Sequence, residues 1–154
     1  MIRPDPKLSI ADQEPAVLLR MLGWGEARGE GSLAVLAVCH TPYNRLGKIG
    51  ADLKSVMLHP WAYSCFNASD PNRGKLLAAY VTNRESWIMV DTVCTLIEQA
   101  GTVDPTHGAT HYCTENLWNV VRAGNPKWHD DVEIREGRTK ELARIGGHVF
   151  AVAP

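Results

Sequence analysis

The sequence predicts a single, mainly α (α+β) domain, and three observations favour this fold class. Apolar residues recur at three- and four-residue steps over 17–22, 32–38 and 74–99, as they do in amphipathic helices. The chain has 154 residues, of which 45% are hydrophobic, so it can bury one substantial core. No repeat, low-complexity tract or linker divides it. We therefore expect residues 1–154 to form one domain, in which 1–14 is an N-terminal extension.

The first two helices can be placed from the residues at their ends. Pro15 suits the first turn of a helix that ends near Gly25 and Gly29. A second helix begins near Ser32. We expect Pro42 to kink or end this second helix, because proline lacks the N–H that a helix interior needs and its ring clashes with the preceding turn.

The remainder of the chain gives weaker patterns. The segment 74–99 predicts either one helix or two helices that break near 83–86. Residues 47–72 predict a long loop with a short helical turn, which suits a cleft wall better than a core element. The other expectations are a short extended segment at 110–113 and irregular structure, with at most one helical turn, over 116–140.

The most informative segment is 25–30, where two glutamates stand four residues apart as an apolar helix gives way to glycines. Cleaving a glycosidic bond requires protonation of a poorly basic oxygen, and a carboxyl group does this at neutral pH only when partial burial raises its pKa. Glu26 has apolar neighbours in sequence and lies near a helix C-terminus, where the dipole favours a neutral acid. On spacing alone, a solvated charge patch formed with Arg28 and Glu30 is the commoner explanation.

The segment 25–30 resembles the Gly-Glu-Ala-Arg-Gly-Glu signature of the SleB-type cell-wall hydrolases, a family that includes spore-cortex-lytic enzymes and phage endolysins. Further motifs follow in the family's order between about residues 16 and 150. They are Asn44-Arg45, Tyr63-Ser64-Cys65-Phe66-Asn67, the segment 104–112, Asn125-Pro126-Lys127-Trp128 and the segment 145–150. The chain departs from the family at Pro42, which interrupts the helix before Asn44, and at His107, where the family has glycine.

The resemblance implies a lysozyme-like fold with a substrate cleft, and peptidoglycan glycan strands as the partner. It also implies a lytic transglycosylase in which Glu26 protonates the oxygen between N-acetylmuramic acid and N-acetylglucosamine, then takes the proton of the muramoyl 6-hydroxyl as a 1,6-anhydro ring closes. Glu30 is a supporting or second acid. A hydrolytic muramidase, in which water replaces the 6-hydroxyl, is the alternative.

Substrate contacts are assigned within the matching motifs. Sugar rings stack on aromatic side chains, while their hydroxyls bond to amides, hydroxyls and imidazoles. The candidate substrate-binding residues are Ser64, Phe66, Asn67, Thr110, His111, Tyr112 and Trp128. Aromatic residues outside the motifs are more often core than platform, so four tryptophans are assigned to core or surface. These are Trp24, Trp61, Trp87 and Trp118.

Three other classes of function stay open. His107, His111 and Cys113 suggest a metal site like that of peptidoglycan amidases, but no carboxylate triad accompanies them, so we expect no metal or other cofactor. A cysteine peptidase acting on the stem peptide would use Cys65 as nucleophile and His111 as base. A non-catalytic wall-binding or virion domain is the third. The four cysteines are widely spaced without a Cys-x-x-Cys pair, so we expect mostly buried thiols.

Charge and hydropathy limit the partners and the location. The 16 basic and 17 acidic residues nearly cancel, so no nucleic acid or anionic membrane surface is expected to bind. There is no apolar run of the roughly 18 residues that a membrane span needs. The N-terminus lacks the apolar core of a secretory signal. We therefore expect a monomer made in the cytoplasm that reaches the wall or periplasm through a holin pore or inside a virion.

Overall fold

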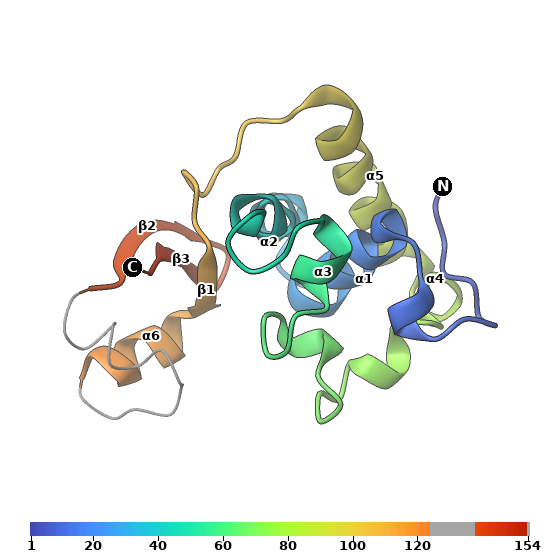
Figure 1. Ribbon diagram of the computed structural model, residues 1–154, viewed down its shortest axis with the longest axis horizontal. Helices are drawn as coiled ribbons and strands as arrows, with labels where there is room; N and C mark the ends of the chain where they lie inside the picture. Colours follow the sequence, from blue (N-terminus) through green and yellow to red (C-terminus); the bar gives the residue numbers. More distant parts are fainter. Residues whose placement is uncertain (124–137, 154) are drawn as a thin grey trace.

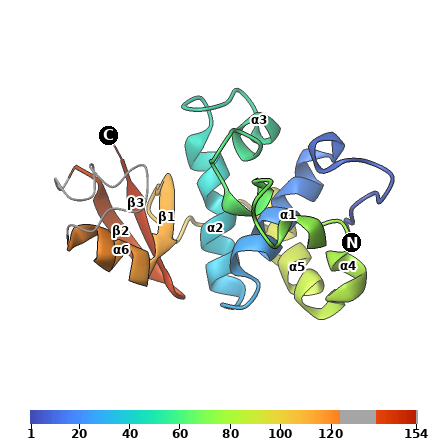
Figure 2. The same cartoon turned by 90° about the horizontal axis from the view of Figure 1, so that it is seen from below.

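The computed structural model describes residues 1–123 and 138–153. It confirms a mainly helical domain with a small antiparallel sheet, which lie side by side in both views (Figures 1 and 2). The long helices are α1 (Pro15–Ala27), α2 (Ser32–Arg45) and α5 (Arg84–Ala100). The short helices are η1 (Ile10–Asp12), α3 (Leu53–Met57), η2 (Ser64–Phe66), η3 (Arg73–Lys75), α4 (Ala79–Thr82) and α6 (Glu115–Arg122). The strands are β1 (His111–Thr114), β2 (Lys140–Ile145) and β3 (His148–Val152).

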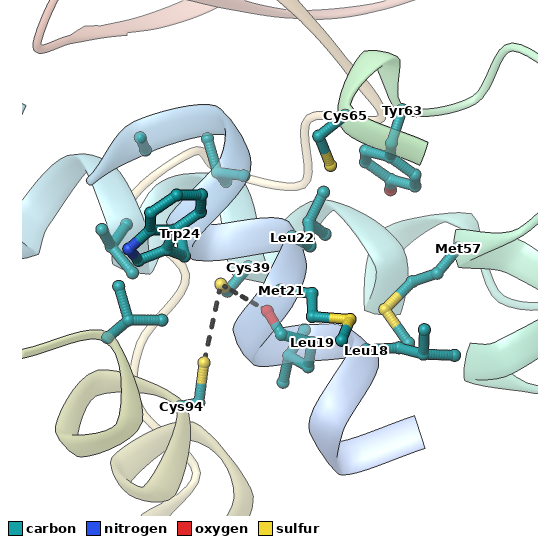
Figure 3. Close-up of a cluster of buried hydrophobic side chains, with 14 of the residues drawn as sticks. Leu18, Leu19, Met21, Leu22, Trp24, Cys39, Met57, Tyr63, Cys65 and Cys94 are labelled. Carbon is teal, nitrogen blue, oxygen red and sulfur yellow. Dashed lines mark hydrogen bonds between the residues drawn. The ribbon is translucent and has the colours of Figure 1, made fainter. Parts of the chain in front are cut away.

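Helix α1 is the central element of the core. Ten of its 13 residues are buried, because it carries apolar side chains on every face and packs against α2, α3 and α5. Figure 3 shows Leu18, Met21 and Leu22 of this helix among side chains from α3 and α5. Its buried cation, Arg20, is neutralised by Asp91 at 2.6 Å and Glu98 at 3.0 Å, both on α5. The end of α1 is thus fixed by the best-packed part of the molecule.

Helix α2 runs through Pro42, so of the two expected outcomes the ending of the helix at this residue is wrong. The proline leaves the carbonyl of Val38, four residues earlier, without its helical donor. The side-chain hydroxyl of Thr41 donates to that carbonyl at 2.8 Å. Because the lost bond is replaced and Thr41 itself is buried, the helix continues to Arg45. This continuation carries Asn44 and Arg45 to the sheet.

The sheet has the order β1-β3-β2, and all its pairs are antiparallel. Tyr112 on β1 lies opposite Phe150 on β3, and Thr114 lies opposite His148. The turn between β2 and β3 places Gly146 at a φ of 59°, which glycine adopts without steric cost.

The region after β1 differs from the expected irregular structure. Residues Glu115–Arg122 form the eight-residue helix α6, and the hydroxyl of Thr114 accepts the N–H of Leu117 at 3.3 Å as its N-terminal cap. Helix α6 buries Trp118 and Val121 against the sheet residues Cys113, Val149 and Ala151. The other boundaries agree with the patterns: the segment 74–99 is divided, and α5 begins at Arg84.

Across residues 1–123 and 138–153, no helix combines the length and apolar character needed to cross a membrane.

Candidate active site

A cleft of about 810 Å³ lies where the end of α1 meets β1 and β3. The segment 59–67, which follows α3 and includes η2, forms its other wall. The polar and aromatic side chains that line this cleft are Glu26, Arg45, Lys48, His59, Trp61, Tyr63, Ser64, Asn67, Thr110, His111, Tyr112, Thr114 and His148. Of the cleft-lining residues that the structure describes, Glu26 is the only one with a carboxyl group.

Glu26 lies in the last turn of α1 and is half-buried. Its Oε1 accepts a hydrogen bond from the Ser64 hydroxyl at 2.8 Å and another from the backbone N–H of Cys65 at 2.7 Å. Both donors belong to η2, so this short helix fixes the orientation of the carboxyl group. No residue within the described ranges bonds to Oε2. Oε2 is therefore the oxygen available to a ligand.

The two glycines that flank Glu26 have different surroundings. A β-carbon on Gly25 would lie 2.6 Å from the Cβ of Cys65, so the absence of a side chain lets η2 approach α1 closely. Around Gly29 there is no atom within 4 Å of such a β-carbon. Gly25 thus permits the two hydrogen bonds to Glu26, whereas Gly29 tolerates a side chain.

Tyr112 faces Glu26 from the sheet side of the cleft. Its ring lies 5.4 Å from His148, edge to face, and 5.6 Å from Phe150. Its hydroxyl is buried and has no hydrogen-bond partner among the residues described. Burial, together with the negative charge of Glu26, raises the pKa of Tyr112 well above its usual value. The phenol of Tyr112 therefore stays neutral.

The end of α2 joins the two walls of the cleft. Arg45 donates to the carbonyl of Thr110 on the sheet side, and to the carbonyl of Ala62 on the opposite wall at 2.9 Å. Its guanidinium also lies 4.8 Å from the ring centroid of Tyr63. Asn44 donates to Asp104 at 2.8 Å and to the carbonyl of Ala109 at 2.9 Å.

Asp104 organises the loop that leads into β1. It accepts bonds from the N–H and hydroxyl of Thr106 and from the N–H of Gly108, in addition to Asn44. Burial alone would raise the pKa of Asp104, but these hydrogen bonds outweigh it and hold the pKa below its usual value. Two motifs far apart in sequence thus position the residues Thr110–Tyr112 together.

Glu30 lies beyond the end of α1 and outside the lining of the cleft. Its Oε2 accepts the N–H of Gly147 at 2.8 Å and a bond from His148 Nδ1 at 2.9 Å. Glu30 and Glu26, although four residues apart, therefore do not lie on one face of a helix. Its contacts are those of a positioning residue that ties the β2–β3 turn to the end of α1.

Five of the expected substrate-binding residues line the cleft with Glu26. They are Ser64, Asn67, Thr110, His111 and Tyr112. Phe66 is a correction: it is 8% exposed, belongs to the core and is not part of the lining. Trp128 lies outside the described residues. Sequence reasoning did not assign Trp61, Arg45 or His148 to the site, although all three line the cleft.

The structure also describes the residues on which the cysteine peptidase and metal alternatives depend. Cys65 is 1% exposed, and burial, followed by the charge of Glu26, raises the pKa of its thiol well above the usual value, so it is a poor thiolate nucleophile. All four cysteines are buried and free.

The residues of the metal alternative lie apart in their surroundings. His107 is exposed on a turn at a φ of 57°, whereas His111 lies on β1 in the cleft. Over 1–123 and 138–153, no three His, Cys, Asp or Glu side chains gather as metal ligands would.

Comparison with known proteins found no matching family model and no matching curated protein. Two solved structures match. The catalytic domain of the Bacillus cereus SleB protein has a TM-score of 0.58 at 19% identity, covering 91% of this chain and 91% of that chain. The catalytic domain of the germination-specific lytic transglycosylase SleB from Bacillus anthracis has a TM-score of 0.59 at 19% identity, covering 91% and 96%. This chain therefore has a fold similar to that of the SleB catalytic domains.

Proposed function

We propose that this chain degrades peptidoglycan by cleaving the glycosidic bond between N-acetylmuramic acid and N-acetylglucosamine, as a lytic transglycosylase with Glu26 as its catalytic acid. The observation that carries the proposal is the geometry of Glu26. One carboxyl oxygen is held by Ser64 and Cys65, while the other is open to a large cleft. The similarity of the fold to the catalytic domain of a lytic transglycosylase supports the same reaction.

The reaction needs one acid that later acts as a base. The proton on Oε2 of Glu26 passes to the bridging oxygen, the bond from that oxygen to the muramoyl C1 breaks, and the sugar's own N-acetyl oxygen stabilises the cation at C1. The carboxylate then removes the proton of the muramoyl 6-hydroxyl as its oxygen bonds to C1. This step closes the anhydro ring and returns Glu26 to its acid form. No water is consumed.

The composition of the cleft favours this scheme over a two-carboxylate hydrolase. Retaining and inverting glycosidases generally place a second carboxylate across the scissile bond from the acid. The described part of the cleft lining supplies only Glu26, and Glu30 is engaged with Gly147 and His148. Tyr112, the sheet residue whose phenol stays neutral, lines the same cleft as Glu26 and supplies no second negative charge. Action as an endolysin and the route to the wall stay predictions.

Digestion of purified peptidoglycan tests the proposal. Wild-type protein should release muropeptides with anhydro termini, seen by mass spectrometry as products 18 mass units (about one water) lighter than hydrolysed ones. Glu26→Gln should lose nearly all activity but still bind the wall, because the amide keeps the shape of the carboxyl group and cannot donate an acidic proton. Reducing sugar ends would support a muramidase instead, and new free amines would support a peptidase.

A further inference from the structure

Trp61 stands out among the tryptophans that the structure describes. Its side chain is 72% exposed, whereas Trp24, Trp87 and Trp118 are at most 3% exposed. Exposed apolar residues are common on protein surfaces, so exposure alone indicates no function. Trp61, however, is also part of the lining of the cleft that holds Glu26.

The backbone of Trp61 gives a second, independent observation. Its φ is 65°, in the left-handed region that bulky L-residues rarely occupy. The N–H of Ala62 donates to the carbonyl of His59 at 3.0 Å, which closes a turn with Pro60 and Trp61 at its centre. Proline followed by a residue with positive φ is the pattern of a type II turn, where the second central position normally carries glycine or asparagine. The chain thus keeps a tryptophan at a strained position, although its exposed ring adds little to the core.

The turn fixes the backbone of Trp61 beside the cleft. Pro60 restricts the backbone before Trp61, and Ala62 after it is anchored by the bond from Arg45 at 2.9 Å. Because this backbone is already ordered before binding, it loses little conformational entropy when a ligand stacks on the ring. The ring is therefore placed to bind at the rim of the cleft and not to support the fold.

We propose that the indole of Trp61 is a stacking platform for a sugar ring of the glycan strand, at a position removed from the bond that Glu26 cleaves. This proposal rests on the proposed function, because it takes the same strand as its ligand. The C–H face of a sugar ring packs on an aromatic face, and an exposed indole offers the largest such surface among side chains. A contact that is equal in the bound substrate and in the transition state changes KM and leaves kcat unchanged.

Three substitutions separate the ring from the backbone. Trp61→Gly removes the ring and relieves the positive φ, Trp61→Ala removes the ring and keeps the strained position, and Trp61→Phe retains an aromatic face. We expect both ring deletions to raise KM for peptide-free glycan strands about tenfold, with kcat within about twofold, as for the loss of one stacking contact. Trp61→Phe should recover most of the affinity. Trp61→Gly should unfold at a temperature no lower than that of the wild type.

Affinity is measured separately from turnover by calorimetric titration of the same strands into proteins that also carry Glu26→Gln. Leu96→Ala is the matched control, because Leu96 is 50% exposed on α5 and lies outside the cleft lining. An unchanged affinity in Trp61→Gly, or an equal loss in Leu96→Ala, would overturn the platform while anhydro products from the wild type still support the proposed function. Absence of any glycan cleavage by the wild type would instead overturn the proposed function.

Discussion

The carboxylate of Glu30 accepts a hydrogen bond from Nδ1 of His148 at 2.9 Å, although 118 residues separate them in sequence. The same oxygen also accepts the N–H of Gly147, so one side chain holds the β2–β3 turn and a residue of the cleft. Glu30, the second glutamate of the segment 25–30, therefore contacts the sheet and lies outside the cleft lining.

Glu30→Ala should destabilise the protein while leaving the chemistry in place. Removing the acceptor leaves the buried His148 ring without this partner, whereas the exposed Gly147 N–H can bond to water, so the cost is about 1 kcal/mol. Urea unfolding measures the loss, and mass spectrometry of the digest should still find anhydro products. A fully stable but inactive Glu30→Ala protein would instead make Glu30 a second acid.

Ser64→Ala tests the orientation of Glu26. It removes the donor at 2.8 Å from Oε1 but keeps the N–H of Cys65. The carboxyl group of Glu26 therefore becomes more mobile but retains one of its two hydrogen bonds. We expect kcat on peptidoglycan to fall about tenfold, the size expected for one hydrogen bond to an ionisable group, with little change in KM. Ser64→Thr, which retains the hydroxyl, is the control, and it should restore most of the lost rate. Equal rates for wild type and Ser64→Ala would show that Ser64 does not position the acid.

Gly25→Ala and Gly29→Ala form a matched pair at the end of α1. The new methyl group of Gly25→Ala would lie 2.6 Å from the Cβ of Cys65 and push η2 away from Glu26, whereas that of Gly29→Ala meets no atom within 4 Å. The first change should cost about 1–3 kcal/mol of stability and most of the activity, and the second should be close to neutral. Thermal unfolding and turbidity clearing of cell-wall suspensions measure the two effects. Similar behaviour of the two variants would contradict the close approach.

Asp104→Asn should reveal a stabilisation that depends on pH. The folded-state pKa of Asp104 lies below the ordinary value of 3.8, because its hydrogen bonds outweigh its burial. A lowered pKa gives stability that is complete above the unfolded value and is lost as the pH falls through the folded value. The variant should therefore unfold at a lower temperature than the wild type near neutral pH, and the difference should shrink as the pH falls below 3.8. An equal difference in unfolding temperature at neutral pH and at acid pH would mean that the charge of Asp104 plays no part. Glu14→Gln, at an exposed carboxylate, is the control.

The sequence predicted the features that depend on local patterns. The apolar period and Pro15 located α1, which placed Glu26 at its end. The break at Pro42 was wrong because a neighbouring threonine supplies the missing hydrogen bond, a local substitution that periodicity does not register. Helix α6 was missed because it is short and largely polar; its helical character shows only in a few apolar residues that meet the sheet.

The contacts that assemble the site could not be read from the sequence. Glu30 contacts His148, and Arg45 bonds to both walls of the cleft. These contacts join segments that are far apart in sequence, and no periodic pattern in the sequence relates them. The burial of Phe66 follows from the direction in which η2 presents its side chains, which the motif does not specify. Trp61 carried a usable signal, because a Pro-Trp pair within a loop between helices is compatible with an exposed turn.

The burial of α1 on all sides has a practical consequence for protein engineering. Most substitutions along this helix disturb the interior and displace Glu26, the proposed proton donor, at the same time, so libraries that aim to change the proposed activity should leave it intact. Diversity is better directed to the surface segments 46–50 and 59–62, which border the cleft without forming the helical interior. Specificity and reactivity can then be altered separately, since they reside on different parts of the scaffold.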